Sequence, residues 1–121
     1  MEIVHLAERE AFITADGSGI RELAHPGWTA ARAQSLAEAT VEPGGETAEH
    51  YHPRSEENYY FTAGRGRMRL GAEEAEIGAG DCVVIAPGAV HKLWNTGDER
   101  LVLLCCCSPA YSHDDTVLTG R

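Results

Sequence analysis

The chain has 121 residues, and its 19 acidic side chains outnumber its 10 Lys and Arg, which gives a formal net charge of −9. This length suits a single domain, residues 1–121. Because nucleic acids and anionic membranes require a basic surface, the charge argues against both as partners. The opening residues lack the positive region and apolar core of a secretory signal, so we expect a cytoplasmic protein.

Short strands are the elements that the sequence predicts. Residues 8–34 show no sustained pattern, and this part could open with a short helix or an extended arm. Further on, glycine, proline and acidic turn residues separate a series of apolar or alternating stretches. These stretches are residues 35–41, 56–63, 65–71, 75–88, 91–95 and 100–107. The polar tail, 112–121, is expected to be irregular with loose last residues. Such spacing of short strands predicts an all-β sandwich or barrel.

Two histidines and a glutamate open the most informative stretch, EHYHPRSEENYYF. Residues two apart on a strand share a face, so His50 and His52 project together. A turn follows, and Glu57 starts the next strand, while His91 starts another after the turn APGAV. Three imidazoles and one carboxylate on strands of one small barrel could converge inside it. Such a set leaves open positions on a six-coordinate divalent ion.

The spacing of these residues is similar to that of the cupin family. The first cupin motif, G-x5-H-x-H-x4-E-x6-G, matches residues 44–64, and the second, G-x5-P-x-G-x2-H-x3-N, matches residues 80–95. One position departs from the second motif, since Ala86 stands in place of proline, with Pro87 beside it. This departure affects the turn and leaves the ligand positions intact.

The resemblance implies a double-stranded β-helix, or jelly-roll, cupin barrel. It also implies one divalent metal ion per chain, bound by His50, His52, Glu57 and His91. Manganese or iron is favoured, and the family also uses zinc, nickel, cobalt or copper.

The period of two along a strand predicts the neighbours of these ligands. Tyr59 and Phe61 share the face of Glu57, and Leu93 and Asn95 share that of His91. We expect these four residues to line the cavity or its floor and to contact substrate, although core packing for the aromatic residues and a structural hydrogen bond for Asn95 are the alternatives. The same argument places Tyr60, Lys92 and Trp94 on the outer face.

Arginines and the remaining histidines suggest no second site. Arg65, Arg67 and Arg69 alternate with smaller or apolar residues and are expected on a solvated outer face. Arg21 could reach a substrate carboxylate, but a surface ion pair is the simpler interpretation. His5, His25 and His113 have no partner at a metal-binding spacing and are expected to be exposed.

The four cysteines are Cys82 and the run 105–107. Neighbouring residues on a strand point to opposite faces, so the run cannot form an ordinary set of disulfides. Reduced thiols on buried strand positions are the main interpretation, and a redox or ligand role is the alternative.

We considered three functions for such a barrel. The favoured function is a metal-dependent enzyme that acts on a small oxygen-rich molecule by dioxygenase chemistry. The first alternative is a metal-dependent isomerase or lyase that acts on a sugar or another small molecule. The second alternative is a non-catalytic protein that binds a small ligand. Sheet edges and outward aromatic residues also predict a homodimer.

Overall fold

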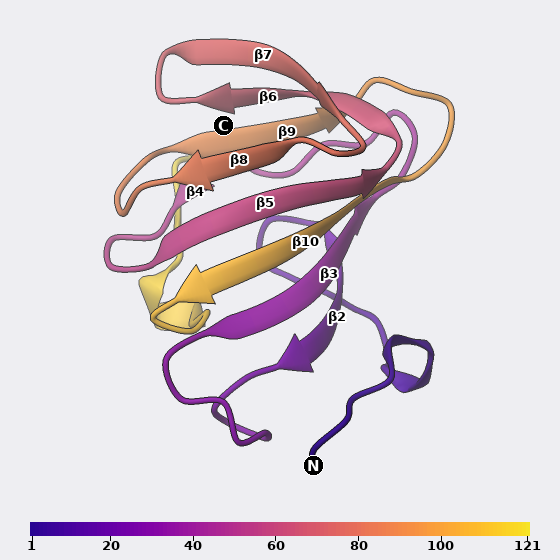
Figure 1. Ribbon diagram of the computed structural model, residues 1–121. Coiled ribbons are helices and arrows are strands. Elements are labelled where there is room, and N and C mark those ends of the chain that lie inside the picture. The colour runs from indigo at the N-terminus through magenta and orange to yellow at the C-terminus, as the bar shows by residue number, and fades with distance from the viewer.

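Two antiparallel sheets form the protein, whose computed structural model describes residues 1–121 (Figure 1). The larger sheet has six strands in the order β1-β2-β3-β10-β5-β8: β1 (Phe12–Ile13), β2 (Gly19–Ala24), β3 (Ser35–Val41), β10 (Leu101–Ser108), β5 (Glu56–Ala63) and β8 (Cys82–Ile85). The smaller has five in the order β11-β4-β9-β6-β7: β11 (Val117–Leu118), β4 (His50–Tyr51), β9 (His91–Asn95), β6 (Arg65–Leu70) and β7 (Glu73–Gly78). The predicted all-β jelly roll is confirmed.

The core lies between the sheets and follows the alternation of the strands. In β5, every second residue from Glu57 to Phe61 is buried, while Tyr60 between them is 46% exposed. Leu101 and Leu103 on β10 face the same interior. The remaining core residues come from both sheets, and they are Ala39, Val41, Met68, Ile77, Ile85 and Leu93. The structure contains no helix with the length and apolar character that a membrane crossing requires.

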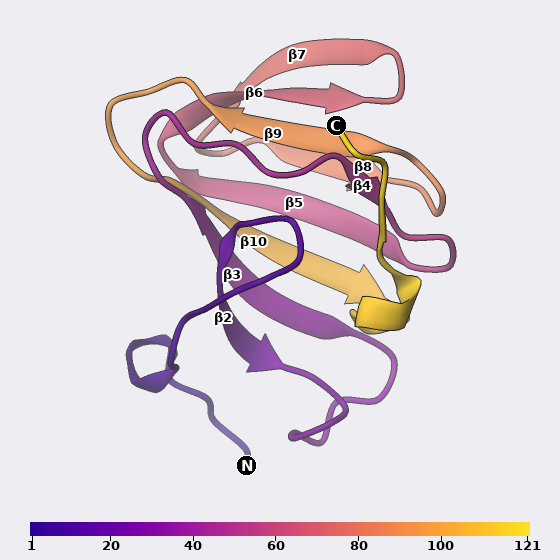
Figure 2. The same ribbon diagram turned by 180° about the vertical axis from the view of Figure 1, so that it is seen from behind.

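The N-terminal part opens with a short helical turn and continues as a hairpin, and it forms no extended arm. One 3-10 turn, η1 (Leu6–Glu8), precedes β1, which pairs with β2. Figure 2 shows the turn between these strands lying over the inner side of the larger sheet. Its position is fixed by a hydrogen bond from the backbone N–H of Ala48 to the carbonyl oxygen of Asp16, at 2.7 Å.

The C-terminal tail is ordered, in contrast to the loose tail expected from its polar sequence. A second 3-10 turn, η2 (His113–Asp115), leads into β11, which pairs with β4 (Figure 2). The carboxylate of Asp115 accepts hydrogen bonds from the backbone N–H groups of Arg54 and Ser55. Long-range hydrogen bonds of this kind, which no local pattern shows, hold the tail against the barrel.

Lys92 lies on the outer face of β9, as expected, but it is buried there. Its face of β9 is covered by the tail, so the ammonium group donates to the carbonyl oxygen of Arg121 at 2.6 Å and pairs with Glu46 at 3.1 Å. Trp94, on the same face, is half-buried, with the guanidinium of Arg69 5.2 Å from its ring centre.

The other basic side chains lie outside the barrel, as expected. Arg65 and Arg67 are exposed, and Arg67 and Arg69 pair with Glu74 and Glu49. His5 and His113 are exposed, whereas the ring of His25 is half-buried and bonded to the backbone oxygen of Tyr111.

A close backbone approach at Gly66 gives the first testable prediction. A Cβ atom there would collide with the carbonyl oxygen of Trp94 and lie 2.9 Å from the side chain of Leu101. Gly66→Ala should therefore lower the free energy of unfolding by about 3 kcal/mol in urea titrations. Gly19→Ala is the matched control, because its Cβ would meet only the oxygen of Thr40 at 3.8 Å. Equal stabilities of the two variants would contradict the packing described here.

Candidate metal centre

Three histidines converge at one end of the space between the sheets. His50 on β4 and His91 on β9 are partners across neighbouring strands, and His52 follows β4 directly. All three are buried, and their ligand nitrogens lie within 4.8 Å of one another. The predicted convergence of these three side chains is confirmed.

Hydrogen bonds fix the orientation of each imidazole ring. The Nδ1 atoms of His50 and His91 lie 2.9 and 2.8 Å from the carbonyl oxygens of Ala48 and Ala89, each two residues earlier in the chain. The Nδ1 atom of His52 lies 3.0 Å from the carbonyl oxygen of Asp115 in the tail. A carbonyl oxygen only accepts, so each Nδ1 carries the proton and each Nε2 keeps its lone pair.

Glu57 on β5 completes the cluster. Its Oε1 lies 3.4 Å from Nε2 of His52 and 3.6 Å from Nε2 of His91. Neither Oε1 of Glu57 nor Nε2 of His91 has a hydrogen-bond partner, although both atoms are fully buried. Leaving such atoms without a partner is costly, and a cation held between them would satisfy both. Neutral imidazole nitrogens with one carboxylate are a donor set that suits a divalent transition metal.

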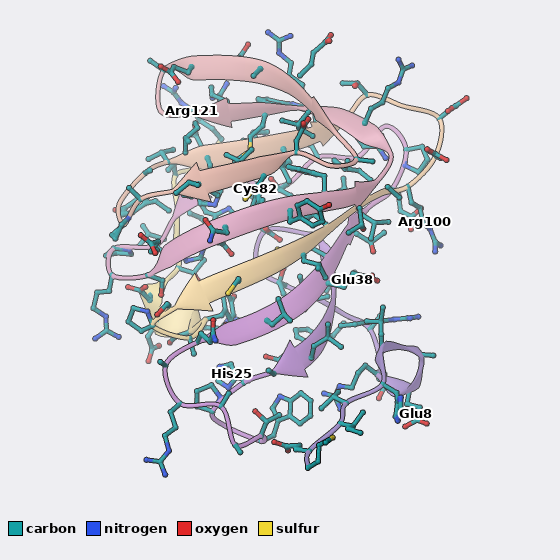
Figure 3. The ribbon with its side chains drawn as sticks, viewed as in Figure 1. Glu8, His25, Glu38, Cys82, Arg100 and Arg121 are labelled. Carbon is teal, nitrogen blue, oxygen red and sulfur yellow. The ribbon has the colours of Figure 1, made fainter.

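Cys107 is a part of the site that the sequence argument left open. Its thiol donates to Oε2 of Glu57 at 3.0 Å, which leaves Oε1 free toward the histidines. Cys105 shares this inward face and also lines the cavity, whereas Cys106 points away and contacts Gln34. No disulfide is present, and Cys82 is exposed instead of buried, on the outer face of the larger sheet (Figure 3).

The electrostatics of the cluster favour an ionised carboxylate. Burial alone would raise the pKa of Glu57, but the nearby imidazoles of His52 and His91 and the hydrogen bond from the Cys107 thiol outweigh it and lower this pKa from 4.5 to about 2. Burial opposes protonation of His52, yet the nearby carboxylate of Glu57, which would stabilise a proton on the ring, raises its pKa above 6.5. Burial and the charge of His91 lower the pKa of His50.

A cavity opens from the metal centre toward solvent, with an empty volume of about 730 Å³ that includes its mouth. Tyr59 and Leu93 line it as expected. Phe61 does not, because it is fully buried in the core below. Asn95 does not line it either, since its side-chain nitrogen donates to the carbonyl oxygens of Val41 and Glu99 and its oxygen accepts from Gly97.

Several lining residues come from segments that the motifs do not cover. They are Phe12, Thr14, Asp16, Ser18, Ile20 and Glu22 from the N-terminal hairpin, and Tyr111 and Thr116 from the tail. Arg21 does not line the cavity.

Comparisons with known proteins agree with this fold. The model of the family described as "Cupin domain" matches residues 37–107. The chain is 50% identical to the uncharacterized protein MJ1618 of Methanocaldococcus jannaschii over 105 residues, which are 87% of this chain and 84% of that protein. It is 32% identical to Protein SchB of Streptomyces halstedii over 99 residues, 82% of this chain and 72% of that protein.

Among solved structures, an oxalate decarboxylase of Lactobacillus farciminis in complex with formate superimposes with a TM-score of 0.81 at 26% identity. The match covers 95% of this chain and 35% of that chain, so this chain corresponds to about a third of the decarboxylase. The nucleoside dehydratase Pac13 has the same fold, with a TM-score of 0.78 at 20% identity over 99% of this chain and 92% of that one.

Metal binding gives the second prediction. Replacing His50 and His52 together by Ala removes two of the three imidazole donors, so the double variant should hold less than about a tenth of the metal bound by the unchanged chain. Elemental analysis after loading with Mn²⁺, Fe²⁺ or Zn²⁺ measures this, and His5→Ala, at an exposed histidine, is the control. Full occupancy in the double variant would disprove the ligand assignment.

The pH dependence of metal affinity is the third prediction. A proton on His52 competes with the metal, and the raised pKa of this histidine strengthens that competition. Affinity for the metal should therefore be greatest near pH 8. As the pH is lowered, the affinity should begin to fall before the pH reaches the ordinary histidine pKa of about 6.5. Isothermal titration with Zn²⁺ between pH 8 and pH 5 measures the effect, and an affinity that stays constant over this range would exclude histidine ligation.

Proposed function

The chain belongs to the cupin family, and on that premise we propose that it is a metal-dependent enzyme acting on a small oxygen-rich organic molecule. The observation that carries this proposal is the pair of buried, unpartnered atoms, Oε1 of Glu57 and Nε2 of His91, beside an open cavity that Glu57 helps to line. A passive pocket does not need such a costly arrangement, which argues against a purely ligand-binding protein.

His50, His52, Glu57 and His91 would hold the ion. A divalent metal bound there would supply Lewis-acid chemistry and, as iron or manganese, the means to activate dioxygen. Tyr59 and Leu93 form part of the wall beside the ligands. Together with Ile20, Ala39 and Leu103, they would limit the access of bulk water to the reacting groups.

Dioxygenase chemistry is the reaction we favour, and the apolar wall supports it, since dioxygen and an uncharged organic substrate both partition into such surroundings. An isomerase or lyase is the second candidate. It is supported by Asp16, whose carboxylate lies in the cavity 3.9 Å from Nε2 of His50, where a side chain could transfer a proton.

Substrate screening under two atmospheres separates these reactions. The protein loaded with Fe²⁺ or Mn²⁺ is mixed with small enols, catechols and thiols in an oxygen electrode, and the same mixtures are followed by NMR under nitrogen. We expect oxygen uptake that the His50→Ala, His52→Ala variant loses. Equal turnover under nitrogen would instead establish the isomerase or lyase, and metal-loaded protein without any turnover would favour the binding protein.

The role of Glu57 is the fourth prediction. As a ligand, its carboxylate is held ionised by the cation and has little affinity left for a proton. Glu57→Gln should therefore weaken metal binding about 10- to 100-fold and regain substantial activity once metal saturates the site. Activity is measured at rising metal concentration beside Glu38→Gln, a control on the outer face of β3 (Figure 3). A fully metallated but inactive variant would show that Glu57 transfers a proton.

Assembly as a homodimer is the fifth prediction. The outer face of the larger sheet exposes Tyr60 and Val84, at 46% and 65%, on neighbouring strands β5 and β8. Trp94 belongs to the other sheet, so it would not join this patch. Sedimentation should give about twice the chain mass of 13.1 kDa, and Val84→Lys should shift the protein toward the monomer. A monomeric mass for the unchanged chain at micromolar concentration would contradict the dimer.

A further inference from the structure

A second carboxylate, that of Asp16, is held firmly beside the metal ligands. It lies in the turn between β1 and β2, where its Oδ1 accepts three hydrogen bonds: from the hydroxyl of Thr14 at 2.7 Å, and from the backbone N–H and hydroxyl of Ser18 at 2.9 and 2.6 Å. Its own carbonyl oxygen accepts from the N–H of Ala48 at 2.7 Å. The same Ala48 supplies the carbonyl that orients His50, so the turn and the ligand are fixed to each other.

The other oxygen of Asp16 is free. Its Oδ2 receives no hydrogen bond from the chain and lies 3.9 Å from Nε2 of His50, in a side chain that is 14% exposed. Because Asp16 lines the cavity, a molecule bound there can donate a hydrogen bond to this oxygen. A hydroxyl or an amine group is the chemistry it would accept.

Tyr59 offers the complementary group in the same cavity. The residue is only 4% exposed, and its ring stands edge-on to His91 with ring centres 5.6 Å apart. No hydrogen bond within the chain reaches its hydroxyl, although buried tyrosine hydroxyls usually have a partner. A carbonyl oxygen of a bound molecule would provide one.

The charge of the cavity restricts what can enter. Three carboxylates, those of Asp16, Glu22 and Glu57, line it, and no Lys or Arg does. Even with a divalent cation bound, the acidic groups outnumber the positive charges by one. A carboxylate or phosphate ester would therefore meet net repulsion and find no guanidinium or ammonium to pair with.

We propose that the substrate is an uncharged hydroxy-carbonyl compound, such as a hydroxy ketone, an enol or a phenolic ketone, whose hydroxyl donates to Oδ2 of Asp16 and whose carbonyl accepts from Tyr59. This inference rests on the proposed function and names the class of molecule that the metal site acts on. It excludes dicarboxylates and sugar phosphates.

A matched pair of probes tests the inference. 3-Hydroxyacetophenone and 3-hydroxybenzoate share ring and hydroxyl, but the first ends in a neutral ketone and the second in a carboxylate. Their dissociation constants are measured by NMR titration with both zinc-loaded and metal-free protein. We expect the zinc-loaded protein to bind 3-hydroxyacetophenone about tenfold more tightly than 3-hydroxybenzoate. In the metal-free protein this preference should be larger, because no cation then offsets the charge of the carboxylates.

Three variants assign the effect to residues. Asp16→Asn should reduce the preference for the neutral probe toward unity, and Glu22→Gln, which keeps the hydrogen bonds of the Asp16 turn, should shift it in the same direction. Tyr59→Phe should weaken the neutral probe about fivefold, the loss expected for one neutral hydrogen bond. Glu38→Gln removes the same charge from outside the cavity (Figure 3) and should leave the preference unchanged.

The outcomes separate this inference from the proposed function. If the protein binds zinc but 3-hydroxybenzoate binds as tightly as the neutral probe, or if neither Asp16→Asn nor Glu22→Gln shifts the preference, the substrate class is wrong and the metal enzyme stands. If elemental analysis finds no zinc after loading, the proposed function fails, and the titrations of the metal-free protein still decide whether the cavity selects uncharged molecules.

Discussion

The orientation of three imidazole rings is the constraint on which the site depends. A buried histidine can turn either ring nitrogen toward its neighbours. Here the Nδ1–H group of each ring donates a hydrogen bond to a backbone carbonyl oxygen, so each Nε2 faces the other rings. Two of these carbonyls, from Ala48 and Ala89, lie two residues before their histidine, so the segments that lead into β4 and β9 provide them locally. The third belongs to Asp115, and it requires the tail to be in place. The arrangement of this histidine cluster thus depends on a segment outside the barrel strands.

Local spacing was sufficient to predict that these three histidines share one side of the barrel, and the resemblance to cupins added Glu57 to the candidate ligands. The separations of His50, His52, Glu57 and His91 reflect the period of two and the glycine-containing turns between strands, which are properties of nearby residues. The same period placed Tyr59 and Phe61 on one face. It could not tell that Tyr59 reaches the cavity while Phe61 lies in the core, because alternation gives the face of a side chain but not its depth.

Hydrogen bonds between distant segments account for what the sequence did not show. Cys107 contacts Glu57 across 50 residues, and Asp115 contacts His52 across 63. The polarity of the tail suggested a loose end, yet its carboxylate is satisfied by backbone N–H groups of the turn after His52. Asp16 gave no signal either, since an acidic residue before glycine reads as an ordinary surface turn. Each of these residues acquires its role only when the sheets close.

The paired strands β5 and β10 carry apolar core residues at one end and the polar residues of the candidate site at the other. Leu103 faces Phe61, Cys105 faces Tyr59, and Cys107 faces Glu57, so polarity rises on both strands in step. At the Phe61 end, side chains are fully buried and apolar, and their burial stabilises the fold. At the Glu57 end, unpartnered polar atoms reduce stability and leave groups available to a cation or a substrate. The apolar contacts at the Phe61 end therefore offset the free-energy cost of the unpartnered polar atoms at the Glu57 end. The antiparallel register of β5 and β10 places both sets of residues on the same pair of strands.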